Sequence, residues 1–161
     1  VVNERDGLGD ETPPDYLTSV LDGGFYGWPY CYWGQTVDDR VPQDAALVAR
    51  AVTPDYALGG HTASLGLCWM PAGTLPGFGD GMVIGQHGSW NRSKLSGYRV
   101  IFVPFHDGRP SGPPRDILWG FLSPDEKVSY GRPVGVAIGP DKASILVADD
   151  VGDVILRVSG A

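Results

Sequence analysis

The sequence predicts an all-β protein, specifically a partial β-propeller of about two to three blades. Signals for helices are nearly absent, since only residues 13–20 and 42–52 can form a helical turn or two. Beyond residue 60, short apolar runs alternate with turns rich in glycine and proline. A unit of three strands also recurs after roughly 60 residues, close to the repeat period of propeller blades. A sandwich of short strands is the competing architecture.

The expected elements follow from the apolar runs in chain order. The segment 42–52 has Pro42 ahead of AALVARA, and proline suits the first turn of a helix. Each later run has the length of a buried strand. The expected strands are residues 64–69, 82–85, 98–105, 116–122, 134–138, 144–148 and 154–158. The run 116–122 is expected as the outer strand of its unit.

Composition excludes several classes of function. The formal net charge is −7 and the basic residues are scattered, which argues against nucleic acid as a partner. No apolar run has the roughly 18 residues that a membrane span needs. Cys31 and Cys68 lie in apolar or aromatic settings, which favours buried free thiols over a disulfide or a metal site.

The chain of 161 residues is long enough for one domain with its own core. Propellers usually need at least four blades to close, and the sequence does not begin with Met. We therefore expect residues 1–161 to be a piece of something longer.

Two segments near the N-terminus carry polar or aromatic clusters. In residues 3–11, Asp6, Asp10 and Glu11 alternate with glycines, an arrangement that suits calcium, which binds oxygen ligands, or a polar surface loop. Residues 22–34 contain six aromatic side chains, which form either a core edge or a surface on which a sugar stacks. The core edge is the expected role.

The loop GQHGSWNR, residues 85–92, carries more hydrogen-bonding groups than a hairpin needs. Gln86, His87, Asn91 and Arg92 are expected to point to one end of the sheets. His87 is either functional or a satisfied structural histidine. Arg132 lies just before the expected strand 134–138. An arginine at the end of a strand is usually solvated or in a salt bridge.

Five stretches together resemble the C-terminal part of the glucose/sorbosone dehydrogenase family. They are ERDGLGD, GGFYGWPYCYWG, PDYALGGHTASLG, IGQHGSWNRSKLSGYRVIFVPF and YGRPVGVAIGPDKASILVADD. They occur in matching order over nearly the whole chain and look most similar to L-sorbosone dehydrogenase-like members. The resemblance implies a six-bladed propeller that holds pyrroloquinoline quinone (PQQ) and Ca2+ at one end and oxidises sugars or sugar aldehydes.

The resemblance also implies roles for individual residues. Asp6 and Gly7 match the stretch that holds calcium, and Val134 stands where soluble glucose dehydrogenases have a second arginine. The family's catalytic base is a histidine upstream of NERDG, and none of His61, His87 and His106 stands at its place. We therefore expect the base outside this chain. The residues expected to bind the cofactor are Arg5, His61, Thr62, Ser64, His87, Asn91, Arg92, Lys94 and Arg132.

The functional expectation is thus one wall of a PQQ- and calcium-dependent sugar or sorbosone dehydrogenase, which is inactive as an isolated piece. Its expected partners are the sugar substrate, an electron acceptor such as a cytochrome or quinone, and the remaining propeller blades. The family resemblance implies a periplasmic or secreted location. The alternative is a non-catalytic propeller module that binds carbohydrate or a protein partner.

Overall fold

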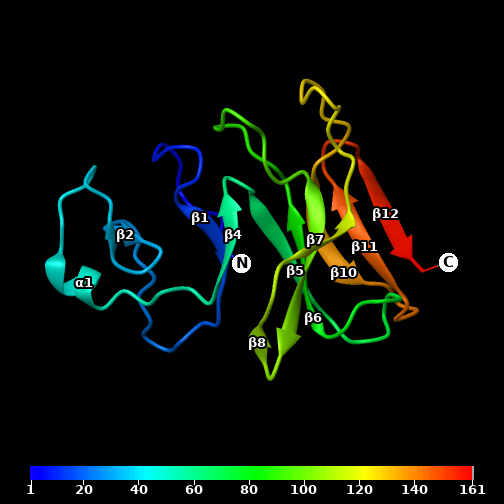
Figure 1. Cartoon of the computed structure of the whole chain (residues 1–161), viewed down its shortest axis with the longest axis horizontal. Helices are drawn as coiled ribbons and strands as arrows, with labels where there is room; N and C mark the ends of the chain where they lie inside the picture. Colours follow the sequence, from blue (N-terminus) through cyan, green and yellow to red (C-terminus); the bar gives the residue numbers. More distant parts are fainter. Residues whose placement is uncertain (161) are drawn as a thin grey trace.

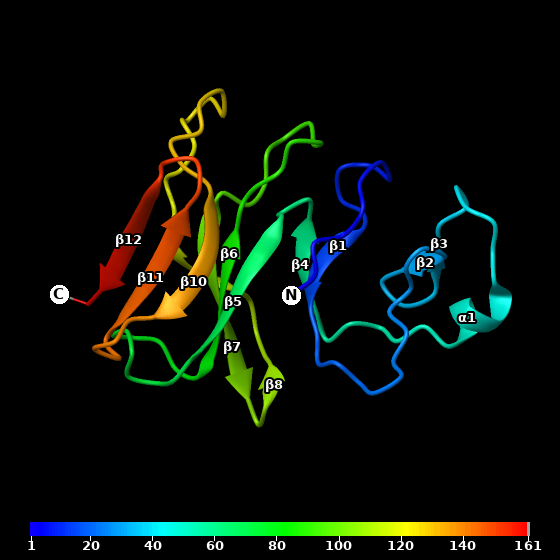
Figure 2. The ribbon, with the colours of Figure 1, turned by 180° about the vertical axis from the view of Figure 1, so that it is seen from behind.

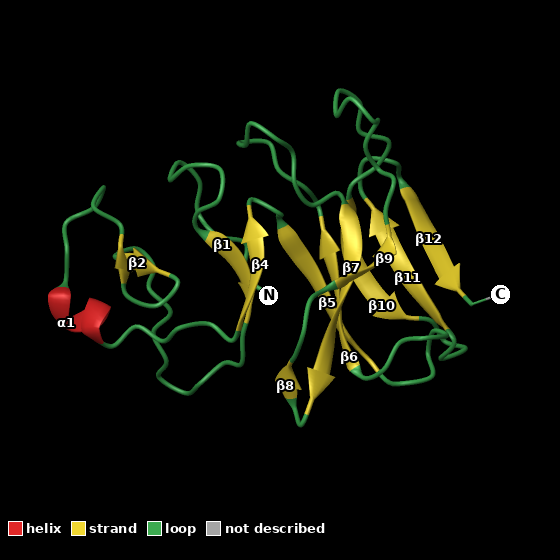
Figure 3. Ribbon diagram, in the orientation of Figure 1, coloured by secondary structure: helices red, strands yellow, loops and turns green. Residues whose placement is uncertain are grey.

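The computed structural model describes residues 1–160, and nearly all of the regular structure is β-strand (Figures 1 and 3). The largest sheet is antiparallel, in the order β5-β6-β7, with β9 on the far side of β7. A short strand β8 pairs with the end of β7. The bounds are β5 Ser64–Met70, β6 Gly81–Gln86, β7 Arg99–His106, β8 Arg109–Pro110 and β9 Arg115–Leu118.

A second antiparallel sheet stands beside the first, and both views show it (Figures 1 and 2). It contains β10 Pro133–Ile138, β11 Ser144–Asp149 and β12 Val154–Ser159 in that order. On the other side of the large sheet lies a two-stranded sheet of β1 Pro14–Leu17 and β4 Tyr56–Gly60. The three sheets therefore stand in a row, as neighbouring propeller blades do.

The segment between β1 and β4 contains the remaining elements. A small hairpin joins β2 Cys31–Tyr32 to β3 Thr36–Val37. The only helix among residues 1–160 is α1 Ala45–Ala49. The side chain of Asp44 caps α1 by accepting hydrogen bonds from Ala46 N and Leu47 N, which sets the start of the helix. No helix in the described part of the chain is long and apolar enough to cross a membrane.

The structure confirms the seven strands expected beyond residue 60 and a short helix within residues 42–52. The expectation of a helical turn in residues 13–20 is wrong, because Pro14–Leu17 is strand β1. Tyr16 and Leu17 are buried there, and the strand gains a partner in β4. Pairing and burial outweigh a weak local preference for helix.

Burial bears on two other expectations. Five of the six aromatic residues in 22–34 are half-buried, which agrees with the expected core edge, and the sixth, Trp28, is 68% exposed. Cys31 and Cys68 are both free thiols, as predicted. Cys31 is buried but Cys68 is only half-buried.

The core between the two larger sheets depends on close approach of their backbones. A Cβ at Gly66 or Gly85 would lie 2.1 Å or 2.4 Å from the carbonyl oxygen of Val134 on β10. Only glycine fits at such a distance. The apolar cluster packed here is Met70, Leu75, Val83, Val100, Phe102, Ile145 and Val147. A second cluster joins the large sheet to β1 and β4 and contains Leu17, Leu58, Ile84, Ile101 and Val103.

Three long loops extend from the same end of the sheets, the upper end in Figure 1. They are the blue loop before β1, the green loop between β6 and β7, and the yellow loop between β9 and β10. Because antiparallel neighbours alternate in direction, the loops after every second strand meet at one end. This end therefore receives polar residues from distant parts of the sequence.

Candidate functional site

A cavity of about 240 Å³ lies among these loops, and we call it the Arg132 cavity. It brings together four of the residues expected to bind the cofactor or metal, namely Asp6, His61, His87 and Arg132. They come from four separate segments of the chain. The other lining residues are Asn3, Ala63, Leu65, Gly88, Ser89 and Trp90.

Arg132 stands immediately before β10, and its guanidinium group is held from two sides. Its Nε donates to the carbonyl oxygen of His87 at 2.9 Å, and Nη2 donates to the carbonyl oxygen of Gly88. The guanidinium carbon lies 5.2 Å from the ring centre of Tyr98. Nη1 has no hydrogen-bond partner among residues 1–160, so one donor of this cation remains available in the cavity.

The turn after β11 supports Arg132 and His87. Asp149 accepts the backbone N–H of Arg132 at 2.8 Å and also those of Val151 and Gly152. Burial opposes ionisation of Asp149, but these backbone donors outweigh it and lower its pKa. The neighbouring Asp150 binds Nε2 of His87 at 2.9 Å, which fixes the ring orientation. Nδ1 of His87 has no protein partner in the described chain.

His61 is buried at the wall of the cavity with both ring nitrogens occupied. Nδ1 lies 2.8 Å from the Asp6 carboxylate and Nε2 lies 2.7 Å from the carbonyl oxygen of Gly9. Its backbone is in the left-handed region with φ of 57°, which shapes the tight connection from β4 to β5. Because both ring nitrogens contact residues of the N-terminal loop, His61 holds that loop in place.

Thr62 and Ser64 lie outside the lining of the cavity, in a buried network centred on Asp15. Asp15 Oδ2 accepts the Thr62 hydroxyl at 2.8 Å and the Ser64 N–H at 2.9 Å, while Oδ1 accepts the N–H of Glu4. Burial raises the pKa of Asp15, and these donors oppose that rise. Gln86 joins the same network by donating to the Ser64 hydroxyl. The network ties β1 and β5 to the start of the N-terminal loop.

Arg92 connects segments beside the cavity and does not line it. Nη1 donates to the carbonyl oxygens of Asp10 and Gly60 at 2.9 and 3.1 Å, and Nη2 pairs with Glu11. Nε is buried and has no partner in the described residues. Asn91 and Lys94 flank Arg92 on the same loop and also lie outside the cavity lining. Their expected contacts with a cofactor stay predictions.

Arg5 is engaged within the chain and also lies outside the Arg132 cavity. Its guanidinium donates to the carbonyl oxygens of Pro29 and Cys31, both at 2.8 Å, and pairs with Glu4 and Asp38. The side chain is only 5% exposed. The geometry therefore gives Arg5 a structural task, and its expected cofactor contact stays a prediction.

The residues expected to bind calcium do not gather a donor set here. Within residues 1–160 there is no group of three or more His, Cys, Asp or Glu side chains that could hold a metal ion. The carbonyl oxygen of Asp6 accepts Nη1 of Arg40 at 2.9 Å, and its carboxylate already binds His61. The same arginine nitrogen lies 2.8 Å from the position of a Cβ at Gly7. Calcium needs six to eight oxygen ligands, and the surroundings of Asp6 and Gly7 do not supply that number. The role of Asp6 and Gly7 as calcium ligands therefore stays a prediction.

Reasoning from the sequence missed three residues at the site. Trp90 is 75% exposed and lines the cavity. It lies within the polar loop of residues 85–92 but was not among the residues expected to bind the cofactor. An exposed tryptophan in a polar loop was the available signal. Asn3 and Asp150 gave no such signal, because their positions depend on how distant loops meet.

Comparison with known proteins identifies relatives for most of the chain. A model of the family described as TrAA12-like matches residues 34–159. An uncharacterized protein of Borreliella burgdorferi is 32% identical over 159 residues, which cover 97% of this chain and 41% of that protein. The chain thus spans less than half the length of this relative.

Solved structures share the fold at low sequence identity. The holo form of the pyranose dehydrogenase PQQ domain from Coprinopsis cinerea superposes with a TM-score of 0.71 and 23% identity over 99% of this chain and 47% of that one. The calcium structure of a Trichoderma reesei carbohydrate-active enzyme of family AA12 gives a TM-score of 0.73 and 22% identity over 96% and 44% of the two chains. The predicted all-β propeller class is confirmed.

Proposed function

Because the chain belongs to the TrAA12-like family, we propose that its Arg132 cavity forms one wall of a PQQ-dependent site that oxidises sugars or sugar aldehydes. The observation that carries the proposal is the free Nη1 donor of Arg132, held in a cavity together with His87 and Trp90. PQQ is a flat, anionic quinone with three carboxylate groups. A fixed guanidinium suits a carboxylate or a quinone oxygen, and an exposed indole offers a flat apolar face.

When bound, PQQ supplies the redox chemistry by accepting a hydride from the sugar carbon. This chain's residues bind and orient. The positive charge of Arg132 balances an anionic group in the cavity, and Asp149 and Tyr98 keep the arginine in place. His87, oriented by Asp150, presents Nδ1 as a further hydrogen-bonding group.

The proposal places the catalytic base outside this chain. None of His61, His87 and His106 stands at the place of the family's base; both ring nitrogens of His61 are engaged, and His106 is exposed beside the turn after β7. The remaining propeller blades are the proposed source of the base and of the missing oxygen ligands for calcium. Sorbosone as the sugar, a cytochrome or quinone as electron acceptor, and a periplasmic or secreted location belong to the same proposal.

Calorimetric titration of the chain with PQQ tests the assignment. We expect saturable binding to a chain that is folded by circular dichroism, both with added calcium and with a chelator, because the missing oxygen ligands for calcium are proposed to lie in the other blades. A folded chain that takes up no PQQ in either condition would contradict the assignment. It would favour the rival interpretation, a non-catalytic module that binds carbohydrate or protein.

A further inference from the structure

The loop of residues 6–10, which carries the predicted calcium ligands, already has a cation bound to its backbone. Nη1 of Arg40 donates to the carbonyl oxygen of Asp6 at 2.9 Å. The same nitrogen lies 2.8 Å from the position of a Cβ at Gly7, so the guanidinium group packs directly against the bare backbone of this glycine. A carbonyl oxygen that accepts from a guanidinium group is a poor ligand for calcium, because the two cations would repel each other there.

Asp38 fixes Arg40 in this position. Nε and Nη2 of Arg40 donate to the two carboxylate oxygens of Asp38, both at 2.8 Å, and this fork leaves Nη1 to the loop. The Asp38 side chain is only 3% exposed. Hydrogen bonds from Arg40 are the largest cause that holds the pKa of Asp38 well below its usual range, so the carboxylate is ionised at neutral pH. The guanidinium group keeps its charge at any pH at which the chain is folded.

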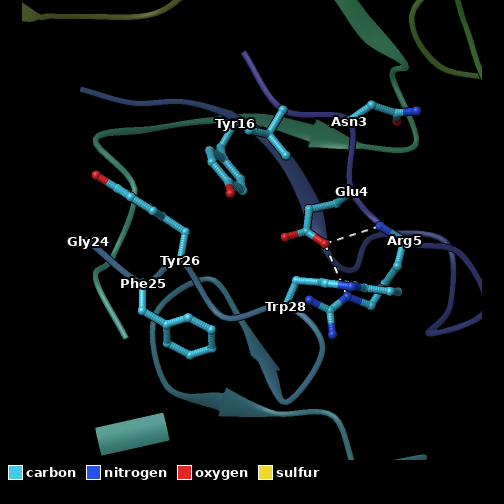
Figure 4. Close-up of a pocket in the computed structure, with 9 residues that line it drawn as sticks. Asn3, Glu4, Arg5, Tyr16, Gly24, Phe25, Tyr26 and Trp28 are labelled. Carbon is cyan, nitrogen blue, oxygen red and sulfur yellow. Dashed lines mark hydrogen bonds and ion pairs between the residues drawn. The ribbon is translucent and has the colours of Figure 1, made fainter. Parts of the chain in front are cut away.

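Arg5, the second arginine at Asp38, is engaged with other groups. It pairs with Oδ2 of Asp38 at 3.2 Å and with the Glu4 carboxylate at 3.1 Å, and Figure 4 shows the contact with Glu4. Its two terminal nitrogens also donate to carbonyl oxygens of Pro29 and Cys31. The cation that reaches from Asp38 to the loop of residues 6–10 is therefore Arg40.

Side chains of the chain itself also contact the other oxygens of this loop. Three further carbonyl oxygens lie within hydrogen-bond distance of a side-chain atom, namely Leu8 with Thr12 at 2.6 Å, Gly9 with His61 at 2.7 Å and Asp10 with Arg92 at 2.9 Å. With Asp6, four of the five carbonyl oxygens in residues 6–10 are engaged in this way. Because calcium needs six to eight oxygen ligands, the loop fits protein side chains better than it fits a metal ion.

We propose that Arg40 takes the place of a calcium ion at Asp6 and Gly7. The guanidinium group joins the backbone of the loop to Asp38, as a metal ion joins oxygen ligands from two segments. The loop in turn presents Asp6 to the Arg132 cavity. Arg40 is thus a positioning residue for that wall, and the wall forms without calcium. Calcium held by the complete propeller would bind to oxygens other than the Asp6 carbonyl.

The test compares calcium with a chelator for the 15N-labelled chain without PQQ, and follows the amide signals of Gly7 and Gly9. In the wild-type chain we expect no saturable shift of these signals up to about 10 mM calcium, a concentration above the range of weak protein sites. Arg40→Ala removes the cation and frees a carboxylate oxygen of Asp38. Its Gly7 signal should therefore shift with a calcium dissociation constant on the order of 1 mM.

Two variants serve as matched controls. Arg40→Lys keeps the positive charge and should respond to calcium no more than the wild-type chain. Arg157→Ala also removes an arginine that pairs with an aspartate, since Arg157 binds Asp141, but this pair involves β12 and not the loop. If Arg40→Ala does not fold by circular dichroism, Arg40→Gln replaces it, because a neutral side chain of similar length should produce the same gain of calcium response.

The outcomes separate this inference from the proposed function. A calcium response in Arg40→Ala or Arg40→Gln that is absent from the wild-type chain and both controls supports it. A saturable calcium shift at Gly7 in the wild-type chain overturns it and leaves the PQQ assignment standing. A neutral variant whose loop signals change equally with calcium and with chelator also overturns it, because Arg40 would then be only a structural contact. Failure of the chain to bind PQQ leaves the inference intact, since no arm of the test uses PQQ.

Discussion

Among residues 1–160, Arg132 is the only arginine or lysine that lines the Arg132 cavity, and replacing it by alanine removes its free donor. The variant loses the Nη1 donor proposed for PQQ and the hydrogen bonds that hold the carbonyl groups of His87 and Gly88. A hydrogen bond to a charged group contributes about 1.5–3 kcal/mol. One lost contact of this kind corresponds to a dissociation constant for PQQ that is roughly 10- to 150-fold higher. Calorimetric titration at a fixed, low salt concentration measures it, because salt screens charge pairs.

Arg115→Ala is the matched control for this experiment. Arg115 also donates to a backbone carbonyl, that of Gly77, and lies over an aromatic ring, that of Phe78, but it is remote from the cavity lining. We expect its PQQ affinity to stay within about twofold of the unmodified chain. Arg132→Lys keeps the charge without the planar fork, so its affinity for PQQ should lie between those of Arg115→Ala and Arg132→Ala. Wild-type affinity in a folded Arg132→Ala chain would refute the reasoning.

Three further predictions concern the fold that supports the cavity. Gly66→Ala places a methyl group 2.1 Å from a backbone oxygen of the next sheet and should cost about 1–3 kcal/mol in urea unfolding, whereas Gly79→Ala, with open space around it, should cost little; equal effects would contradict the close packing of the sheets. Hydrogen bonds from Arg40 and Arg5 hold the pKa of Asp38 well below its usual range, so its contribution is present at neutral pH and is lost as pH falls below about 4. Asp38→Asn should therefore lower the free energy of unfolding by about 3 kcal/mol at pH 7 and less in acid, with exposed Asp39→Asn as the control. Because burial raises the pKa of Asp15, stability should fall as pH rises above about 4 through that raised pKa, and the thermal midpoint of Asp15→Asn should lack this slope; an unchanged slope would exclude Asp15 as its source.

Local patterns were enough to predict most strands. The apolar runs beyond residue 60 became β5 to β7 and β9 to β12 because each run is long enough to form a buried strand and is bounded by turn residues. Asp107-Gly108 adopts positive φ angles of 49° and 74° in the hairpin after β7. Asp and Gly are residues that readily accept this conformation, so the local sequence favours the turn.

The sequence alone determined the strand-rich character of this protein, its turns, and the segments that carry polar groups, because these depend on neighbours along the chain. The tertiary structure decided which polar groups meet. Residues 13–20 became a strand only because β4 offered a partner, and Thr62 and Ser64 turned to Asp15 and not to the cavity. His61, His87 and Arg132 meet because the sheets place distant loops at one end, a consequence of pairing and packing that no local pattern records.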